Sequence, residues 1–290
     1  MDWLHRLLTD NKIPLGLWVK DGVKWITDNF YDQFDAFSRG LGFLIENFAG
    51  LLAAVPPVVL VLLTCAFGYW LHRSWGLVAL IAGGLLLILN LGFWAAMIET
   101  LALVLFATAV SLVLGVPIGI LAARRRWVFV ALRPILDMMQ TIPTFVYLIP
   151  TLILFGLGLV PGLISTVIFA IPAPIRLTHL GISSVPKPLV EAGEAFGATR
   201  WQLLYKVELP HAMPTIMAGV TQCIMLSLSM VVIAALVGAG GLGTPVVRAL
   251  NSVNIGLGFE AGLAIVIVAI LLDRILKQVE PAGRGKTPKP

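Results

Sequence analysis

Seven long apolar runs dominate the sequence and limit what this chain can fold into. They cover approximately residues 50–71, 75–93, 100–123, 135–157, 162–181, 213–237 and 259–276. A helix needs about 20 predominantly apolar residues to cross the hydrocarbon core of a bilayer. Apolar residues make up 59% of the chain and charged residues only 12%, against about 25% charged in a typical soluble domain. We therefore expect an all-α integral membrane protein with about seven transmembrane helices.

The positively charged residues indicate how these spans are oriented. They gather in alternate loops, at residues 124–133 and 176–206, and in the tail at residues 274–289. The intervening loops, near 94–99 and 156–162, contain neither Lys nor Arg. By the positive-inside rule the basic loops are cytoplasmic, so seven spans place the N-terminus outside and the C-terminus in the cytoplasm. The net charge of +5 does not form a basic stripe with interleaved aromatics, and we expect no nucleic-acid binding.

The chain divides into four predicted parts. Residues 1–47 are polar, and from Leu17 to Phe37 the larger apolar residues recur at mixed three- and four-residue steps, which is typical of an amphipathic helix on a membrane surface. A loosely ordered leader is the alternative. Residues 48–94 predict a hairpin of two spans, and residues 95–276 hold the other five. Residues 277–290 are rich in Pro, Gly and Lys and predict a disordered cytoplasmic tail.

The loop at residues 183–214 is too polar to span a membrane, yet it is strongly patterned. Pro188 can open a short helix that continues through Phe196, because a proline in the first turn gives up no needed donor. Gly197 then stands where a helix ends in a left-handed residue, a conformation that glycine adopts at little cost. The first half of the loop therefore predicts a short helix closed by a glycine turn.

The second half of this loop predicts another short helix. Thr199 is a candidate N-cap, and Gln202 three residues later completes a capping box. The helix runs from Arg200 to about residue 207, where we expect Pro210 to stop it. Its apolar side chains are Leu203, Leu204 and Val207. An apolar face on a cytoplasmic loop favours docking into the groove of a partner.

These loop residues resemble a known family motif. Glu191-Ala192-Gly193, three residues, Gly197, nine residues and then Val207-Glu208-Leu209-Pro210 is similar to the EAA motif of ABC importer permeases. Gly193 replaces the third alanine of that motif, and Val207 replaces isoleucine. The resemblance implies a type I ABC importer permease fold with a loop that contacts a separate ATPase subunit. The residues implied in that contact are Glu191, Ala192, Gly193, Gly197, Ala198, Leu203, Leu204, Val207, Leu209 and Pro210.

Further strings narrow the resemblance to permeases for glycine betaine, proline betaine and related compounds. They are residues 140–150, 154–156, 175–178, 209–220 and 240–243. The resemblance implies a permease that acts as a homodimer in the bacterial inner membrane, surrounded by lipid, with two ATPase subunits and an external substrate-binding protein. Its ligand would be glycine betaine, proline betaine, choline or a related solute. An amino acid such as histidine is an alternative ligand, and a secondary solute carrier is the alternative class.

Polar side chains inside the spans are candidates for a translocation path: Thr141, Thr144, Tyr147, Gln222, Ser227 and Ser229. Packing between helices explains small hydroxyl residues as well. Asp137 lies near a predicted span end and has Arg133 four residues earlier, a spacing that favours an ion pair on one helix. Arg176 and His179 are expected to extend to the membrane interface. These placements argue against a proton relay through the spans.

The sequence has no motif for catalysis or for nucleotide binding. It contains neither an H-E-x-x-H metal motif nor a G-x-x-x-x-G-K-[ST] phosphate loop. We therefore expect no catalytic residue, metal site or cofactor in this chain. ATP and Mg would be bound by the partner ATPase.

Overall fold

The computed structural model describes residues 14–277, and every regular element in that range is helical. The expected all-α class is confirmed. Most of the predicted tail, and residues 1–13 of the predicted N-terminal segment, lie outside the described residues.

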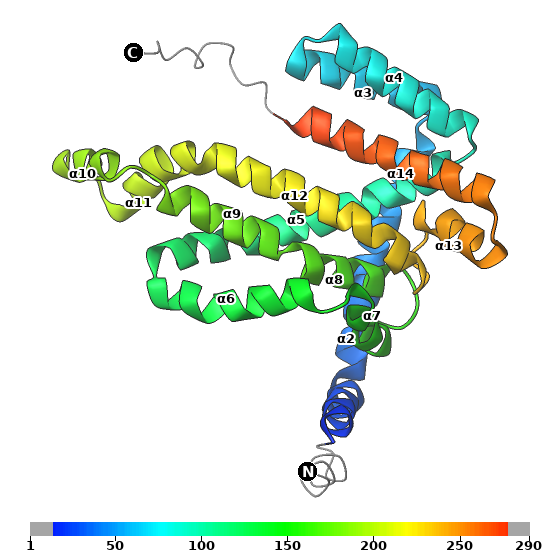
Figure 1. Ribbon diagram of the computed structural model, residues 1–290, viewed down its shortest axis with the longest axis horizontal. Coiled ribbons are helices and arrows are strands. Elements are labelled where there is room, and N and C mark those ends of the chain that lie inside the picture. Colours follow the sequence, from blue (N-terminus) through cyan, green and yellow to red (C-terminus); the bar gives the residue numbers. More distant parts are fainter. Residues whose placement is uncertain (1–13, 278–290) are drawn as a thin grey trace, which may run out of the picture.

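Four helical segments are long and apolar enough to cross a membrane. They are α5 (Trp94–Arg124), α8 with α9 (Leu159–Ala170 and Pro172–Ser183), α12 (Leu209–Ala235) and α14 (Ile255–Leu276). The long helices α5, α12 and α14 run roughly alongside one another (Figure 1). These segments correspond to four of the seven predicted spans. The shorter apolar helix α4 (Trp75–Asn90) lies in a fifth.

Two other predicted spans correspond to bent helix pairs rather than straight helices. Helix α2 (Leu15–Ala54) meets α3 (Pro57–His72) at 97°, and α6 (Arg126–Thr141) meets α7 (Thr144–Phe155) at 97°. The helix predicted at residues 135–157 is therefore broken at Pro143. Pro143 disfavours helical geometry at the preceding residue, and Ile142 is extended, with ψ 131°. Counting each bent pair as one span adds two to the four long segments, which gives up to six crossings before the shorter α4 is counted.

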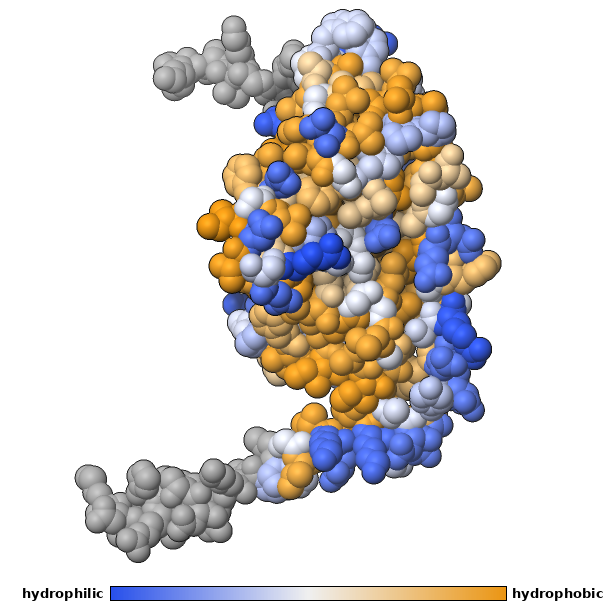
Figure 2. All heavy atoms as spheres, turned by 90° about the vertical axis from the view of Figure 1, so that its right-hand side faces the viewer, coloured by the Kyte–Doolittle hydropathy of each residue, from blue (hydrophilic) through white to orange (hydrophobic). Residues whose placement is uncertain are grey.

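Helix α2 also removes the expected boundary between residues 47 and 48, because it passes that point without a break. Its C-terminal half packs into the molecule: Ile45 is fully buried, and Phe48 contacts Phe106 of α5 edge to face. Its N-terminal half is largely exposed. Figure 2 shows hydrophilic side chains along the segment that leads away from the grey N-terminus.

Small residues allow α5, α9 and α12 to pack closely. A Cβ added at Gly119 of α5 would lie 2.7 Å from the carbonyl oxygen of Ile175 in α9. One added at Gly219 of α12 would lie 3.1 Å from the Cβ of Leu177, also in α9. Close approach through glycine is typical of helix packing in membranes.

The cation-rich turns lie at one end of the bundle. The turn after α3 contacts the end of α14, because His72 Nε2 lies 2.9 Å from the carbonyl oxygen of Ile275. Helix α5 ends at Arg124, beside the polar loop that follows α9. Figure 1 shows the C-terminal ends of α5, α9 and α14 directed toward this side.

Candidate functional site

The loop between α9 and α12 has the predicted helix–glycine–helix form. Helix α10 (Lys187–Ala195) ends before Gly197, which has φ +77°, in the left-handed region. Helix α11 (Arg200–Leu203) follows directly. Glycine adopts this φ with almost no steric cost, since it has no Cβ to approach the carbonyl oxygen. The pair of short helices projects from the end of the bundle (Figure 1).

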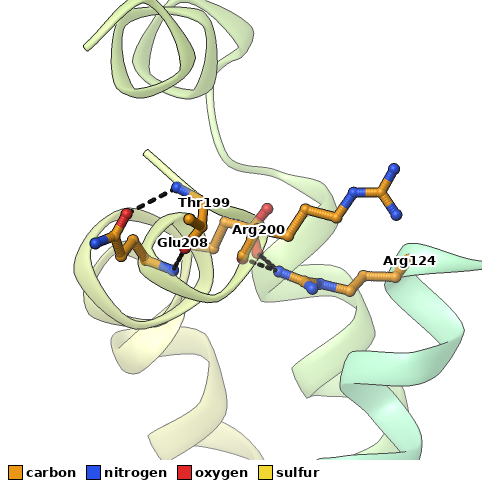
Figure 3. A network of polar contacts seen from close by, with 5 residues as sticks. Arg124, Thr199, Arg200 and Glu208 are labelled. Carbon is orange, nitrogen blue, oxygen red and sulfur yellow. Dashed lines mark hydrogen bonds and ion pairs between the residues drawn. The ribbon is translucent and has the colours of Figure 1, made fainter. Parts of the chain in front are cut away.

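The predicted capping box is present at the start of α11. The Thr199 side chain accepts a hydrogen bond from the Gln202 backbone N–H at 3.4 Å. The Gln202 side-chain oxygen in turn accepts one from the Thr199 N–H at 2.8 Å (Figure 3). Two donors that the helix itself cannot satisfy are therefore paired. This arrangement fixes the direction in which α11 leaves the glycine turn.

Pro210 does not stop the second helix, so that expectation is wrong. The chain widens into a π turn at Leu204–Glu208 and continues directly into α12. In this turn the Leu209 N–H bonds to the carbonyl oxygen of Leu204, five residues back. A proline cannot donate to the helix ladder, and its ring clashes with a carbonyl in a regular α-helix. The wider turn ahead of Pro210 relieves both constraints.

Arg124 ties the loop to the end of α5. Its guanidinium donates hydrogen bonds to the backbone oxygen of Arg200 at 2.9 Å and to Glu208 Oε2 at 3.2 Å (Figure 3). The side chains of Arg124 and Glu208 are 30% and 16% exposed. A motion of α11 is therefore coupled directly to α5, and through the continuous helix to α12.

Two of the apolar residues predicted to face a partner are instead buried within the chain. Leu203 is 5% and Leu204 2% exposed. Leu204 packs with Ile182 and Ala212, and Leu203 lies against Gly193. A Cβ on Gly193 would lie 2.7 Å from Leu203 Cδ2, so the glycine lets α10 and α11 approach each other. The two leucines hold the loop together and do not form its outer surface.

The outer surface of the loop carries aromatic residues that the sequence analysis missed. Phe196 is 93% exposed, Trp201 66% and Tyr205 62%. The rings of Trp201 and Tyr205 stack with centroids 6.0 Å apart. Glu191 and Ala192 of the motif, in α10, are exposed as well. The i, i+4 spacing of Trp201 and Tyr205 is the signal that could have shown one shared helix face.

Two of the three candidate path residues near the break between α6 and α7 form hydrogen bonds with the backbone of α6. Thr141 donates to the Met138 carbonyl oxygen at 3.3 Å, and Tyr147 Oη donates to the Met139 carbonyl oxygen at 2.8 Å. Thr144, the first residue of α7, is half-buried. These three residues therefore surround the point where the chain turns.

The candidates on α12 do not share one face. Gln222 and Ser229 are exposed, and Ser229 donates to the Met225 carbonyl oxygen at 3.0 Å. Ser227 is fully buried, and its hydroxyl has no hydrogen-bond partner among the described residues. Ser227 therefore points into the packed interior and not toward the surface that Gln222 and Ser229 share.

Asp137 pairs with a different residue from the one expected. Arg176 of α9 donates to Asp137 Oδ1 at 2.6 Å and to Gln140 Oε1 at 2.9 Å. No ion pair between Arg133 and Asp137 occurs within the described range. Arg176 is thus held against α6 by these contacts, and His179 stacks on Phe129 with ring centroids 3.7 Å apart. The spacing of residues along α6 suggested Arg133 as the partner of Asp137, and it could not show a contact with a residue of another helix.

At the opposite end of the bundle, α5 holds the glycine-rich loop that follows α12. The Gly241 N–H donates to Glu99 Oε2 at 2.7 Å, and the Leu242 N–H donates to Thr100 Oγ1 at 2.8 Å. Gly241 has φ +73° and Gly240 has φ +75°. These contacts give Glu99 a role in shaping this loop.

Comparisons with known proteins match this architecture. Residues 115–284 match the family described as the binding-protein-dependent transport system inner membrane component. The glycine betaine transport permease OpuAB of Bacillus subtilis is 48% identical over 95% of this chain and 97% of its own. The glycine betaine/carnitine permease GbuB of Listeria monocytogenes is 47% identical, covering 94% and 98%. The glycine betaine/proline betaine permease ProW of Escherichia coli is 42% identical, covering 99% and 79%.

A solved structure agrees with these sequence matches. An inward-facing form of the MetNI methionine ABC transporter superposes with a TM-score of 0.54 at 27% identity, over 61% of this chain and 91% of that one. The helical fold, the polar loop and the relatives together define an integral membrane component of a binding-protein-dependent transporter, and the chain belongs to that family. It is the multi-pass inner-membrane permease subunit of an ABC importer, with a type I importer fold. The subunit is not an enzyme: ATP hydrolysis belongs to a separate ATPase, and a substrate-binding protein is its other partner.

Proposed function

We propose that this permease imports glycine betaine or a closely related zwitterion such as proline betaine or carnitine. The observation that carries the proposal is the identity of 42–48% over 94–99% of this chain with three permeases whose names include glycine betaine. The methionine transporter is 27% identical and covers 61% of the chain, so it supports the fold more than the ligand.

In the proposed assembly two copies of this chain surround the substrate path, and lipid covers their outer surface. The Arg176–Asp137 pair supports a second copy, because its side chains are 37% and 55% exposed in a single chain. Charged side chains within the membrane normally face a bundle interior or a water-filled cavity. A symmetric dimer can turn this face toward the path that the two copies surround.

The proposed orientation puts α10, α11 and the end of α14 in the cytoplasm, with the N-terminus outside. The cations of the turns at 72–74 and 124–126 and of the loop after α9 support this orientation. Helix α2 turns 97° away from α3 and its N-terminal half is largely exposed, which supports the proposal that this half lies along the membrane surface.

The proposed coupling begins when ATP closes the dimer of ATPase subunits, which carries the loop at 183–214 with it. Phe196, Trp201 and Tyr205 present apolar rings to that partner. Because α11 continues into α12 and Arg124 connects it to α5, the displacement reaches two spans at once. The spans would then change from inward-facing to outward-facing, and the external binding protein would deliver its ligand.

ATP hydrolysis by the complex purified from native membranes, through a tag on this chain, tests the ligand class. With the binding protein present, we expect glycine betaine to stimulate hydrolysis more than choline or histidine does. Stimulation by histidine alone would contradict the betaine proposal and favour an amino-acid importer.

A further inference from the structure

The Arg176–Asp137 pair lies within the helical bundle, away from the cation-rich turns. Asp137 follows Arg126, the first residue of α6, by 11 residues. At about 1.5 Å per residue this places it ~16 Å from the cation-rich end of the helix. Arg176 lies within α9, so both residues of the pair belong to helical segments and not to the turns that connect them. The two residues are 39 positions apart in sequence, on α6 and α9.

Apolar packing fixes the pair on the flank of these helices. Leu136 of α6 is buried against Ile171 and Ile175, with Leu132 and Met139 beside it. The polar side chains follow directly along α6 and α9 and remain partly accessible, with Asp137 at 55% and Arg176 at 37% exposure. The charged pair therefore lies on the accessible side of the apolar contact between α6 and α9. Tight helix packing alone does not require such a pair, because the apolar seam already joins the two helices.

We propose that Arg176, Asp137 and Gln140 form a transient binding site for the zwitterionic substrate on the path through the membrane. This inference rests on the proposed function, since it assigns a site to a betaine importer. The ligand is a small molecule with a carboxylate and a quaternary ammonium group, and glycine betaine is the probe.

The chemistry of the site matches both ends of such a ligand. Arg176 uses Nη1 on the Gln140 amide oxygen and Nη2 on one oxygen of Asp137. A guanidinium binds carboxylates through a planar fork, so a substrate carboxylate can take the place of the neutral amide. The Asp137 carboxylate then faces the quaternary ammonium group. A zwitterion meets an opposite charge at each end, and the total charge in the path does not change.

Uptake of labelled glycine betaine into proteoliposomes, measured beside ATP hydrolysis of the same preparation, tests the site. The preparation holds the complete transporter and its binding protein. We expect Arg176→Gln and Asp137→Asn to lower uptake at least tenfold. Betaine-stimulated hydrolysis stays within about twofold, because the cytoplasmic loop is unchanged. The matched control is Asp35→Asn with Arg39→Gln, which removes a 2.8 Å ion pair on the exposed part of α2. The control should keep normal uptake.

A purely structural role for the pair gives different results. An ion pair that only holds packed helices together can often be replaced by apolar residues of similar size without loss of stability. If the pair only joins α6 to α9, the double variant Asp137→Leu with Arg176→Met should transport normally, and that outcome would overturn the site. A parallel loss of hydrolysis and uptake in Arg176→Gln would overturn it too, as a failure of assembly. Absence of betaine stimulation in the unaltered complex would instead contradict the proposed function itself.

Discussion

Gly197 shows how a single residue determines the geometry of the cytoplasmic loop. Its φ of +77° lies where side chains with a Cβ are strained, and the turn joins α10 to α11. Open space surrounds a Cβ built at this position, so the constraint is the backbone conformation and not a neighbouring atom. Replacement should therefore change the relative direction of the two helices while leaving the spans intact.

Substitution at Gly197 should depend on how well the new residue tolerates the left-handed region. We expect Gly197→Val to destabilise the turn by about 1–2 kcal/mol and to reduce betaine-stimulated ATP hydrolysis several-fold. Gly197→Asn is the matched variant and should retain most of the stimulation, because asparagine adopts this conformation more readily. Equal activity of the valine and asparagine variants would show that the turn does not transmit the signal.

The roles of single residues could be predicted from the sequence only where they depend on near neighbours in the chain. Gly197 and the Thr199–Gln202 capping box depend on neighbours within three residues, so their roles were visible along the chain. The partner of Asp137 was not, because Arg176 is 39 residues away and reaches it only when α9 packs against α6. Asp137 was therefore paired with Arg133 in the sequence analysis.

The two short loop elements separate an internal face from an external face. Leu203 and Leu204 fill the space under the loop, while Trp201 and Tyr205 point outward. The sequence pattern indicated a helix with an apolar side but not which apolar side chains would be buried. That choice depends on the close approach of α10 at Gly193 and on the π turn at 204–208, which rotates the following residues.

Alanine substitutions on the two faces should therefore have different effects. Trp201→Ala should weaken binding of the ATPase by about 2 kcal/mol, roughly thirtyfold, with the thermal stability of the permease unchanged. Leu203→Ala should destabilise the loop by about 2–5 kcal/mol through loss of buried contacts. Titration of purified ATPase onto permease in nanodiscs, with melting curves of the permease alone, separates the two. Unaltered ATPase affinity in Trp201→Ala would contradict the docking face.

The positions of the helices could be predicted from the apolar runs, but the bends at prolines could not. All seven runs fall in helices, but the run at 135–157 turns by 97° at Pro143. A proline indicates a break, whereas the angle after it depends on how α7 packs against α8 and α2. The helix from residue 15 to 54, which is kinked at Phe30, was not predicted either. Residues 15–47 as a whole are polar enough to resemble a surface segment, and the burial of Ile45 becomes visible only in the fold.

The proposed orientation of the whole molecule predicts which turns a membrane-impermeant thiol reagent can reach. In a chain with Cys65 and Cys223 changed to alanine, Asn251→Cys at the end of α13 (Gly243–Ser252) should be labelled in spheroplasts. Ser74→Cys, in the turn between α3 and α4, should be labelled only after the membrane is permeabilised. The reverse pattern would invert the topology and move the loop at 183–214 away from the ATPase.

The central claim is that this chain carries substrate with energy from ATP. Uptake of labelled glycine betaine into proteoliposomes with enclosed ATP, added binding protein and ionophores that collapse ion gradients tests it most directly. We expect uptake that requires both ATP and the binding protein and is unaffected by the ionophores. Uptake that proceeds without ATP and stops when the ion gradient collapses would instead identify a secondary carrier.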